Sequence, residues 1–319
     1  MTTRRSFLQL SAASAAATLL PRAVAADTGT VRIGYQKSST LIAILKAEGA
    51  LEKKFTPLGL NVSWHEFTSG LPLLEALNVG SLDFSADVGD TVPVFALAAG
   101  ASLVYVAQEA PSPTAQAILV PANSPITSVA GLKDKKIAVT KAAGAHYLLI
   151  SALNKAGLSF KDITPAYLSP ADGRAAFERG AVDAWVTWDP FVAAAQRQTQ
   201  VRVLADGSNG VAEYQRYYLA STAFVEARPQ LVDVLYTELL RAGKWAKQKP
   251  AQAAAMLAPL WGLDAATVAA ANARRSYEVG PVTPAALREQ QKIADAFSDE
   301  GLLPKRVNVF DAVVWKPQA

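Results

Sequence analysis

The 319-residue chain contains no cysteine and only two histidines, His65 and His146. The absence of cysteine excludes disulfide bonds, thiolate catalysis and every metal site with a cysteine ligand. Two histidines leave few ligands for zinc or copper, so we expect no metal or other cofactor. Hydrophobic residues make up 51% of the chain and charged residues 18%, without a long biased tract. This composition predicts a globular protein rather than a disordered chain or a coiled coil.

The chain also lacks a large excess of charge once its first 25 residues are set aside. The formal net charge is +4, and Arg4, Arg5 and Arg22 carry three of these charges. The rest of the chain is nearly neutral, so there is no electrostatic basis for binding nucleic acid.

Residues 1–25 have the pattern of a secretory signal peptide. Arg4 and Arg5 precede a mildly apolar run, residues 8–20, which is followed by the small-residue cleavage pattern Ala23-Val24-Ala25. The arginine pair before Phe7-Leu8 resembles the twin-arginine signal, which predicts export to the periplasm. A signal anchor is the less favoured alternative, because the run is shorter than the roughly 17 to 25 residues of a spanning helix.

A second apolar stretch, residues 92–107, is interrupted by Pro93, Gly100 and Ser102. This pattern favours a buried helix, a glycine stop and a strand. We therefore expect no transmembrane segment in the mature protein.

Strand-like and helix-like runs alternate along the chain, which is typical of a mostly parallel sheet covered by helices. Two stretches about 100 residues apart repeat the order strand, helix, strand, helix, and each ends in Gly-x-x-Asp: Gly80 to Asp83, then Gly180 to Asp183. Each glycine can end a helix in the left-handed conformation, and each aspartate can cap the next turn. The expected elements are residues 31–35, 40–51, 61–67 and a helix from 70, then residues 136–140, 146–156, 164–168 and a helix ending near 180.

This echo predicts an α/β fold with two similar lobes joined by two crossings that act as a hinge. Residues 104–121, with three prolines, are expected to form one crossing, and residues 214–221 the other. The predicted division is a signal peptide at 1–25, lobe I at 26–114 and 217–319, and lobe II at 115–216. Four helical stretches are expected to complete lobe I, at 230–248, 250–260, 265–275 and 284–300.

Ligands of open parallel sheets bind at the carboxyl ends of the strands, against helix N-termini, where unpaired backbone N–H groups favour an anion. Four segments take this position in the predicted lobes. They are Gln36 with Ser38 and Ser39; Gly89 with Asp90 and Thr91; Ala143 and Gly144 with His146 and Tyr147; and Trp188 with Asp189, close to Trp185.

Each candidate also has a purely structural interpretation. Ser38 and Ser39 can be simple helix caps. His146 can be a satisfied core histidine, and Tyr147 can be core as well. Asp90 would repel an anion, as would Asp189, so capping or loop ordering is favoured for both, with recognition of an amino group on a zwitterionic ligand as the alternative.

Sequence motifs of catalysis are missing. The chain has no Gly-x-Ser-x-Gly elbow, no phosphate loop, no His-Glu-x-x-His pair and no Gly-x-Gly-x-x-Gly turn. This favours binding over chemistry.

Several segments together resemble the aliphatic sulfonate-binding proteins of bacterial ABC importers, over residues 31 to about 315. They are Gly34-Tyr35-Gln36-Lys37, residues 74–84, residues 98–106, residues 175–185 and Trp188-Asp189-Pro190-Phe191. The resemblance implies a type II periplasmic binding protein fold that closes on its ligand as a monomer and delivers it to a membrane permease. The pocket positions of the family carry over onto Gln36, Ser38, Ser39, Gly89, Asp90, Thr91, Ala143, Gly144, His146, Tyr147, Trp188 and Asp189.

A sulfonate suits such a pocket because its three oxygens accept hydrogen bonds and stay ionised. Backbone, hydroxyl and amide donors are expected to suffice without a buried counter-charge, with Tyr147, Trp185 and Trp188 as an apolar wall. Binders of taurine or nitrate share the scaffold and are alternatives, as is a module that reports to a sensor. An enzyme on this fold is a further alternative, but the desulfinase likeness relies on a cysteine, which this chain lacks.

Overall fold

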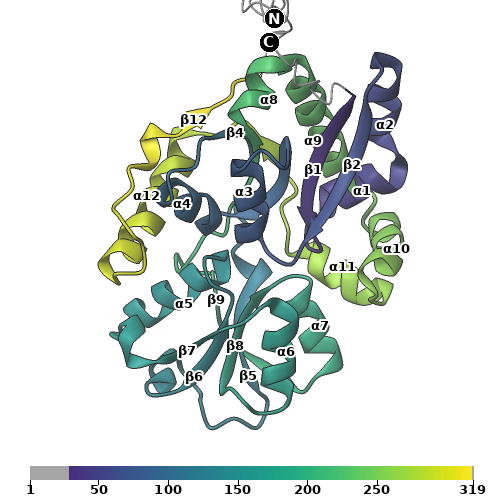
Figure 1. Ribbon diagram of the computed structural model, residues 1–319. Coiled ribbons are helices and arrows are strands. Elements are labelled where there is room, and N and C mark those ends of the chain that lie inside the picture. Colours follow the sequence, from purple (N-terminus) through teal and green to yellow (C-terminus); the bar gives the residue numbers. More distant parts are fainter. Residues whose placement is uncertain (1–28, 318–319) are drawn as a thin grey trace, which may run out of the picture.

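The computed structural model describes residues 29–317, and the predicted twin-arginine signal peptide, residues 1–25, lies outside them. Two β-sheets flanked by helices form two lobes, one above the other in Figure 1. The expected two-lobe α/β architecture is confirmed.

The sheet of lobe I is built from both ends of the described chain. Its strand order is β11-β4-β10-β3-β1-β2, and β12 also pairs with β4. β1 pairs in parallel with β2 and β3, whereas β10 lies antiparallel between β3 and β4. The strands are β1 (Thr30–Gln36), β2 (Asn61–Phe67), β3 (Phe84–Gly89), β4 (Leu103–Glu109), β10 (Arg216–Ser221), β11 (Val279–Gly280) and β12 (Val313–Val314).

The sheet of lobe II has the order β7-β6-β8-β5-β9. Here β5 is the antiparallel strand between β8 and β9. In both lobes, therefore, the antiparallel strand is the first one after the chain has crossed from the other lobe. The strands are β5 (Gln116–Pro121), β6 (Lys136–Val139), β7 (Thr164–Tyr167), β8 (Ala184–Trp188) and β9 (Val201–Asp206).

The helices cover these sheets. They are α1 (Thr40–Glu48), α2 (Ala50–Phe55), α3 (Gly70–Asn78), α4 (Thr91–Ala98), α5 (Gly144–Lys155), α6 (Pro170–Glu178), α7 (Phe191–Gln198), α8 (Thr222–Ala227), α9 (Pro229–Gln248), α10 (Pro250–Trp261), α11 (Ala265–Ala273) and α12 (Pro284–Asp299). Short 3-10 turns occupy Thr56–Leu58, Pro113–Ala115, Val129–Leu132, Phe160–Asp162 and Val309–Asp311. Within residues 29–317, no single helix is long and apolar enough to cross a membrane; α10 and α11, bent by 117°, pass such a test only as a pair, on length and composition.

The expected bounds of one helix and of both crossings are wrong. The single helix expected over residues 40–51 is two helices, because Gly49 takes a left-handed φ of 59° and ends α1. The first crossing is shorter than expected, because β4 continues to Glu109 and β5 begins at Gln116. The second crossing lies earlier in the chain than expected, because β9 ends at Asp206 and β10 already begins at Arg216. The connecting backbone is thus residues 110–115 and 207–215, and in the first crossing the residues on both sides of Pro111 and Pro113 pair into the two sheets.

The two Gly-x-x-Asp motifs perform the same task in the two lobes. Gly80 and Gly180 have left-handed φ angles of 74° and 68°, as expected for glycines that end helices. The aspartates do not cap a turn, however. Asp83 Oδ2 accepts a hydrogen bond from the backbone N–H of Arg32, and Asp183 Oδ2 accepts one from Lys136, both at 2.8 Å. Each aspartate therefore ties its loop to the first parallel strand of its own lobe.

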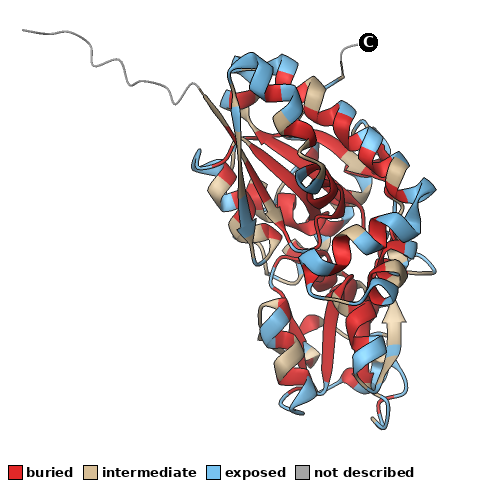
Figure 2. Ribbon diagram, turned by 90° about the vertical axis from the view of Figure 1, so that its right-hand side faces the viewer, coloured by how far each residue is buried: buried red, intermediate tan, exposed pale blue. Residues whose placement is uncertain are grey.

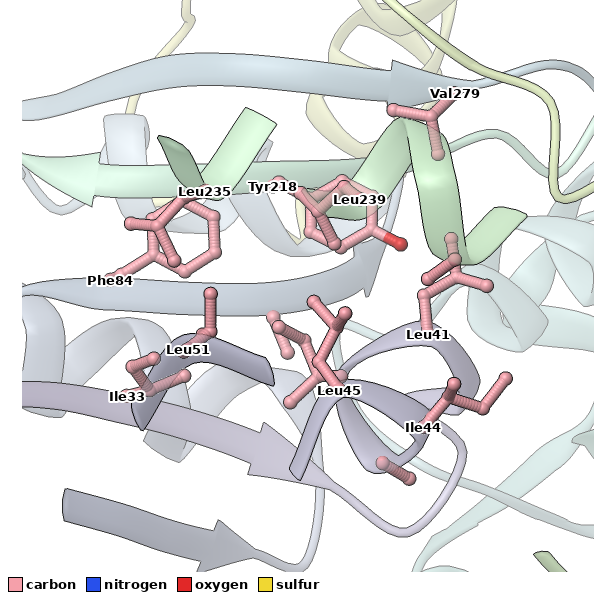
Figure 3. Close-up of a cluster of buried hydrophobic side chains, with 14 of the residues drawn as sticks. Ile33, Leu41, Ile44, Leu45, Leu51, Phe84, Tyr218, Leu235, Leu239 and Val279 are labelled. Carbon is pink, nitrogen blue, oxygen red and sulfur yellow. The ribbon is translucent and has the colours of Figure 1, made fainter. Parts of the chain in front are cut away.

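The hydrophobic core of lobe I lies between its sheet and helices α1, α2 and α9. Figure 3 shows Ile33, Phe84 and Tyr218 of the sheet facing Leu45 of α1 and Leu239 of α9, and all five side chains are fully buried. The buried strands also form the centre of each lobe in Figure 2.

The core of lobe II continues onto α12, near the C-terminus. Phe297 of α12 belongs to the same cluster as Leu148 of α5, and its ring meets Phe95 of α4 edge to face at 5.0 Å. Helix α12 thus contacts α4 and α5, one from each predicted lobe.

Candidate functional site

The carboxyl ends of the parallel strands in the two lobes face each other across a small cavity. β1 ends at Gln36, β3 at Gly89 and β8 at Trp188, while α5 begins at Gly144. The cavity has a volume of about 10 Å³, roughly the room of one water molecule. It is lined by Gln36, Gly70, Gly89, Val92, Ala143, Gly144, Trp188, Tyr214 and Arg216.

Five residues expected from the sequence lie at this cavity: Gln36, Gly89, Ala143, Gly144 and Trp188. They come from both lobes and meet because strand ends of both sheets converge there. Ser38 joins them indirectly.

Ser38 links the two lobes through its hydroxyl group. Its Oγ accepts hydrogen bonds from Trp188 Nε1 of lobe II and from Arg216 Nη2 of lobe I, each at 3.2 Å. Its neighbour Ser39 is fully buried, and Gln36 Nε2 donates to the carbonyl oxygen of Asp87 at 3.0 Å. Ser38 is therefore part of the polar wall between the lobes, and it is not a helix cap.

The helices that begin at this edge offer backbone donors. Within the described residues, α1, α3, α4 and α5 have no side-chain cap, whereas Ser169 caps α6 and Thr283 caps α12 away from the cavity. The first N–H groups of an uncapped helix favour an anion. Thr91 adds a fully buried hydroxyl that has no hydrogen-bond partner in the described structure.

Glycine is required where the lobes touch. A Cβ on Gly144 would lie 2.5 Å from Tyr214 Cε2, and a Cβ on Gly89 would lie 3.2 Å from the backbone nitrogen of Gly144. Real Cβ atoms do not approach other heavy atoms as closely as 2.5 Å. The two glycines thus allow the strand end of lobe I and the helix start of lobe II to meet.

Arg216, at the start of β10, is the most important site residue that the sequence reasoning missed. It is 1% exposed and lines the cavity. Its Nε forms an ion pair with Asp87 Oδ2, and its Nη1 donates to the Tyr214 hydroxyl at 2.7 Å. The expectation of a pocket without a buried charged group is therefore wrong.

A second buried arginine completes this network behind Arg216. Arg275 Nη2 pairs with Glu109 at 2.7 Å and with Asp87 at 3.2 Å. Two guanidinium groups and two carboxylates thus lie together in lobe I, so the network is neutral as a whole. The signal in the sequence is a single charged residue beside apolar ones: Asp87 stands between Ala86 and Val88, and Arg216 directly precedes Tyr217-Tyr218-Leu219.

Asp90 is held tightly by its backbone neighbours. Its N–H donates to the Gln215 carbonyl, and its Oδ2 accepts from the Gln215 N–H, both at 3.0 Å, while Gln290 Nε2 donates to its carbonyl at 2.8 Å. Burial raises the pKa of Asp90 to about 7, and the hydrogen bonds from Gln215 and Thr91 lower it only in part. Its Oδ1 has no hydrogen-bond partner in the described structure.

His146 does not line the cavity. Its ring lies 4.8 Å from that of Phe297, 5.0 Å from Phe160 and 5.5 Å from Tyr167, and its Nδ1 accepts from the N–H of Ala142. Burial, with a smaller contribution from the charge of Lys141, lowers its pKa to about 3. His146 is thus a neutral histidine of the lobe II core.

Trp185 and Asp189 also lie away from the cavity. Trp185 is fully buried against Phe177 in lobe II, so it cannot form the expected ligand wall. Asp189 accepts hydrogen bonds from Nε and Nη2 of Arg274 at 2.6 and 2.7 Å. Because Arg274 follows α11 of lobe I, Asp189 forms an ion pair between the lobes. Tyr147 lines a neighbouring cavity instead.

The described residues contain no group of three or more His, Asp or Glu side chains that could hold a metal ion. What the arrangement can do is bind an anion. It presents one buried guanidinium group, several backbone donors and the indole of Trp188 to one point between two lobes.

The chain is similar in sequence to known binding proteins. A protein of Escherichia coli (strain K12) named as an aliphatic sulfonates-binding protein is 42% identical over 298 residues, which cover 92% of this chain and 92% of that protein. Two solved structures are also close. The alkanesulfonate-binding protein SsuA from Xanthomonas axonopodis pv. citri, bound to MOPS, matches with a TM-score of 0.85 and 41% identity over 90% of this chain and 98% of that one.

The periplasmic aliphatic sulphonate binding protein SsuA from Escherichia coli matches with a TM-score of 0.80 and 42% identity, over 89% of this chain and 97% of that one. These two structures confirm the expected periplasmic binding protein fold. The model of the family described as NMT1/THI5 like matches residues 54–253. The chain belongs to the NMT1/THI5-like family.

Proposed function

We propose that this protein captures aliphatic sulfonates in the periplasm and delivers them to the permease of an ABC importer for sulfur acquisition. The observation that carries the proposal is the position of Arg216, whose guanidinium group is buried at the cavity between the lobes, beside uncapped helix starts. The names of the similar proteins support the same ligand class.

The chemistry of the cavity suits a sulfonate. The Arg216 guanidinium group can donate charge-assisted hydrogen bonds, which are roughly twice as strong as neutral ones. Asp87 holds this group in place, and Arg275 with Glu109 balances the pair, so the bound anion meets an oriented donor rather than a free cation. Trp188 and Val92 provide apolar surface for the alkyl chain.

Binding requires the lobes to move. The cavity of about 10 Å³ is too small for a sulfonate group, so the ligand has to enter while the lobes are apart. We propose that the two crossings, residues 110–115 and 207–215, act as the hinge between lobe I, residues 29–109 and 216–317, and lobe II, residues 116–206. We propose that the protein acts as a monomer and reaches the periplasm by the twin-arginine route.

A ligand screen tests the function. The mature protein, from residue 26 onward, is heated in a buffer free of sulfonates with ethanesulfonate, propanesulfonate, taurine, nitrate or sulfate. We expect the alkanesulfonates to raise the unfolding temperature, since a ligand at 100 times its Kd stabilises by about 2.7 kcal/mol. Stabilisation by nitrate or sulfate alone would contradict the proposal and favour a small inorganic anion as the ligand.

A further inference from the structure

A second cavity of about 160 Å³ lies beside the first, between α5, α12 and the crossing at residues 207–215. It is lined by Asp90, Tyr147, Gly210, Val211, Ala212, Glu213, Glu289, Lys292 and Ile293. Three of these side chains are carboxylates and one is an ammonium group. We refer to it below as the acidic pocket.

The acidic pocket has an excess of negative charge. Lys292 Nζ pairs with Glu289 at 2.6 Å on the same helix, so one carboxylate is already neutralised. Burial and the charge of Glu289 raise the pKa of Glu213. Burial, followed by the charges of Asp90 and Glu289, raises the pKa of Tyr147 to about 12. Burial is the larger cause of both shifts, and the neighbouring carboxylates add to it. Since the pocket has three carboxyl groups and one ammonium group, it favours a cation.

Asp90 connects the acidic pocket to the cavity of the proposed sulfonate site. It lines the acidic pocket, and its neighbour Gly89 lines the first cavity. Its Oδ1 lies 3.3 Å from the position that a Cβ on Gly144 would occupy, at the wall of the first cavity. This oxygen belongs to a side chain that is 4% exposed, and it has no hydrogen-bond partner among the described residues.

We propose that the acidic pocket receives the ammonium group of a zwitterionic sulfonate while the sulfonate group contacts Arg216. The inference rests on the proposed function and names the ligand class more closely. Within the described residues, no three acidic or histidine side chains converge as a metal site would need, so the pocket suits an organic ammonium group rather than a metal ion. Asp90 Oδ1, which lies beside Gly144 of the first cavity, is the proposed acceptor.

The geometry gives a pH signature. The groups that face Asp90 are Tyr147 on α5, Glu289 and Lys292 on α12, Glu213 and Tyr214 on the crossing, and Arg216 and Tyr217 on β10. Since the pKa of Asp90 is about 7, its carboxyl group is mostly neutral at pH 6 and ionised at pH 8.5. An ammonium group binds the ionised form better, so the preference for an amino sulfonate should increase as the pH rises through 7.

The experiment compares 1-propanesulfonate with 3-aminopropane-1-sulfonate, which differ by the ammonium group. Calorimetry on the mature protein at pH 6 and pH 8.5 uses a buffer that contains neither a sulfonate nor a primary amine. The amine remains charged at both values, because an alkyl ammonium group has a pKa of about 10. We expect the ratio of the two Kd values to move at least about fivefold toward the amino sulfonate at pH 8.5.

Matched variants connect this effect to the acidic pocket. Asp90→Asn and Glu213→Gln should each reduce the preference at pH 8.5, and Asp90→Asn should also make it independent of pH. Glu226→Gln is the control, because Glu226 is an exposed carboxylate on α8, at the far end of lobe I in Figure 1. Retained propanesulfonate binding shows that each variant is folded.

The outcomes are distinct. If propanesulfonate binds but the ratio of the two Kd values is the same at pH 6 and pH 8.5, the acidic pocket does not receive an ammonium group. The same conclusion follows if the preference survives both Asp90→Asn and Glu213→Gln. If neither sulfonate binds the native protein, the proposed function itself is wrong.

Discussion

The two lobes share a strand order but differ in charge at equivalent positions. The shared motifs, Gly80 to Asp83 and Gly180 to Asp183, are 100 residues apart. By this offset, Asp87 of β3 is the equivalent of Thr187 of β8. The antiparallel strands begin with Arg216 in lobe I and Gln116 in lobe II, each beside the end of the central parallel strand. All four side chains are buried. Lobe I thus has an ion pair where lobe II has two neutral side chains.

This difference separates two tasks that one scaffold performs. Lobe I holds the Arg216 guanidinium group in a network of four buried charged side chains. Lobe II brings the indole of Trp188 and the glycine start of α5. Under the proposed function, lobe I supplies the charged donor for the sulfonate and lobe II supplies apolar surface and backbone donors.

Substitution of Arg216 should cause the largest loss of sulfonate affinity and of stability. Arg216→Gln leaves Asp87 with Arg275 as its partner, and breaking a buried ion pair costs about 3 to 5 kcal/mol of unfolding free energy. Affinity for propanesulfonate should fall at least about 100-fold. Urea unfolding and calorimetry measure the two effects.

Arg32, near the start of β1 in lobe I, provides a matched control for this variant. Arg32→Gln removes an ion pair with Asp83 in which the arginine side chain is 37% exposed. We therefore expect the free energy of unfolding to fall by less than about 1 kcal/mol, with no change in the affinity for propanesulfonate. Normal sulfonate binding by Arg216→Gln would show that the anion contacts lobe I elsewhere.

The buried, neutral His146 of lobe II should make the protein less stable in acid. The pKa of His146 is about 3 in the folded protein, well below its ordinary value of 6.5, so folding favours the neutral form. Its contribution to stability is present above pH 6.5 and is lost as the pH falls toward 3, by up to about 4 kcal/mol. His146→Gln, which keeps an acceptor for the N–H of Ala142, should lose less stability over this range. Urea unfolding at pH 7.5 and pH 4.5 measures the difference.

His65→Gln provides the control, because the second histidine of the chain is exposed on β2. It should follow the native protein at both pH values. Equal acid sensitivity of His146→Gln and the native protein would mean that His146 is not the group that destabilises lobe II.

The sequence reveals the strand ends of each lobe but not what crosses between lobes. Gln36, Gly89 and Trp188 are predictable because a strand that ends before a helix is a local pattern. Arg216 is not, since β10 is inserted between β3 and β4 after the chain returns from lobe II, and only this pairing brings its side chain to the cavity. The repeat of the Gly-x-x-Asp motif predicts two lobes for the same local reason.

The structural roles of His146 and Asp189 depend on distant parts of the chain. Phe297 of α12 packs on the ring of His146 from 151 positions away, and Arg274 reaches Asp189 from 85 positions away. Both residues stand beside expected helix starts, as ligand-binding residues would. Local pattern cannot separate a residue that faces the cavity from one that faces a remote helix.

A methyl group at Gly144, where α5 of lobe II begins, should reduce sulfonate affinity by an intermediate amount. In Gly144→Ala, the new Cβ meets Tyr214 Cε2 at 2.5 Å, and Tyr214 cannot turn away freely because Arg216 donates to its hydroxyl at 2.7 Å. Overpacking of this kind costs about 1 to 3 kcal/mol, so affinity should fall roughly tenfold to 100-fold. Calorimetry with propanesulfonate measures this loss.

Gly280→Ala is the control for the methyl group, because a Cβ at Gly280 meets no atom within 4 Å. It should bind propanesulfonate like the native protein. If Gly144→Ala also binds normally, the lobes do not approach each other at Gly144 in the bound state.

Loss of the Arg274–Asp189 ion pair between the lobes should cause the smallest change in sulfonate affinity. Arg274 is 23% exposed on its side chain and Asp189 3%, so water weakens the attraction, and its loss in Arg274→Gln should cost only about threefold to tenfold in affinity. Because the pair forms only when α11 of lobe I meets the start of α7, the loss should appear as faster dissociation of propanesulfonate, with the association rate nearly unchanged.

Arg174→Gln controls for the loss of a surface arginine. Arg174 pairs with Glu178 at 2.6 Å and is 28% exposed, but both residues belong to α6 of lobe II, so closure leaves this pair intact. Stopped-flow fluorescence should give the native dissociation rate for Arg174→Gln and a faster rate for Arg274→Gln. Added salt should reduce the difference between them, since it screens the part-exposed pair. Identical rates in the two variants would mean that Asp189 and Arg274 contribute nothing to holding the lobes together.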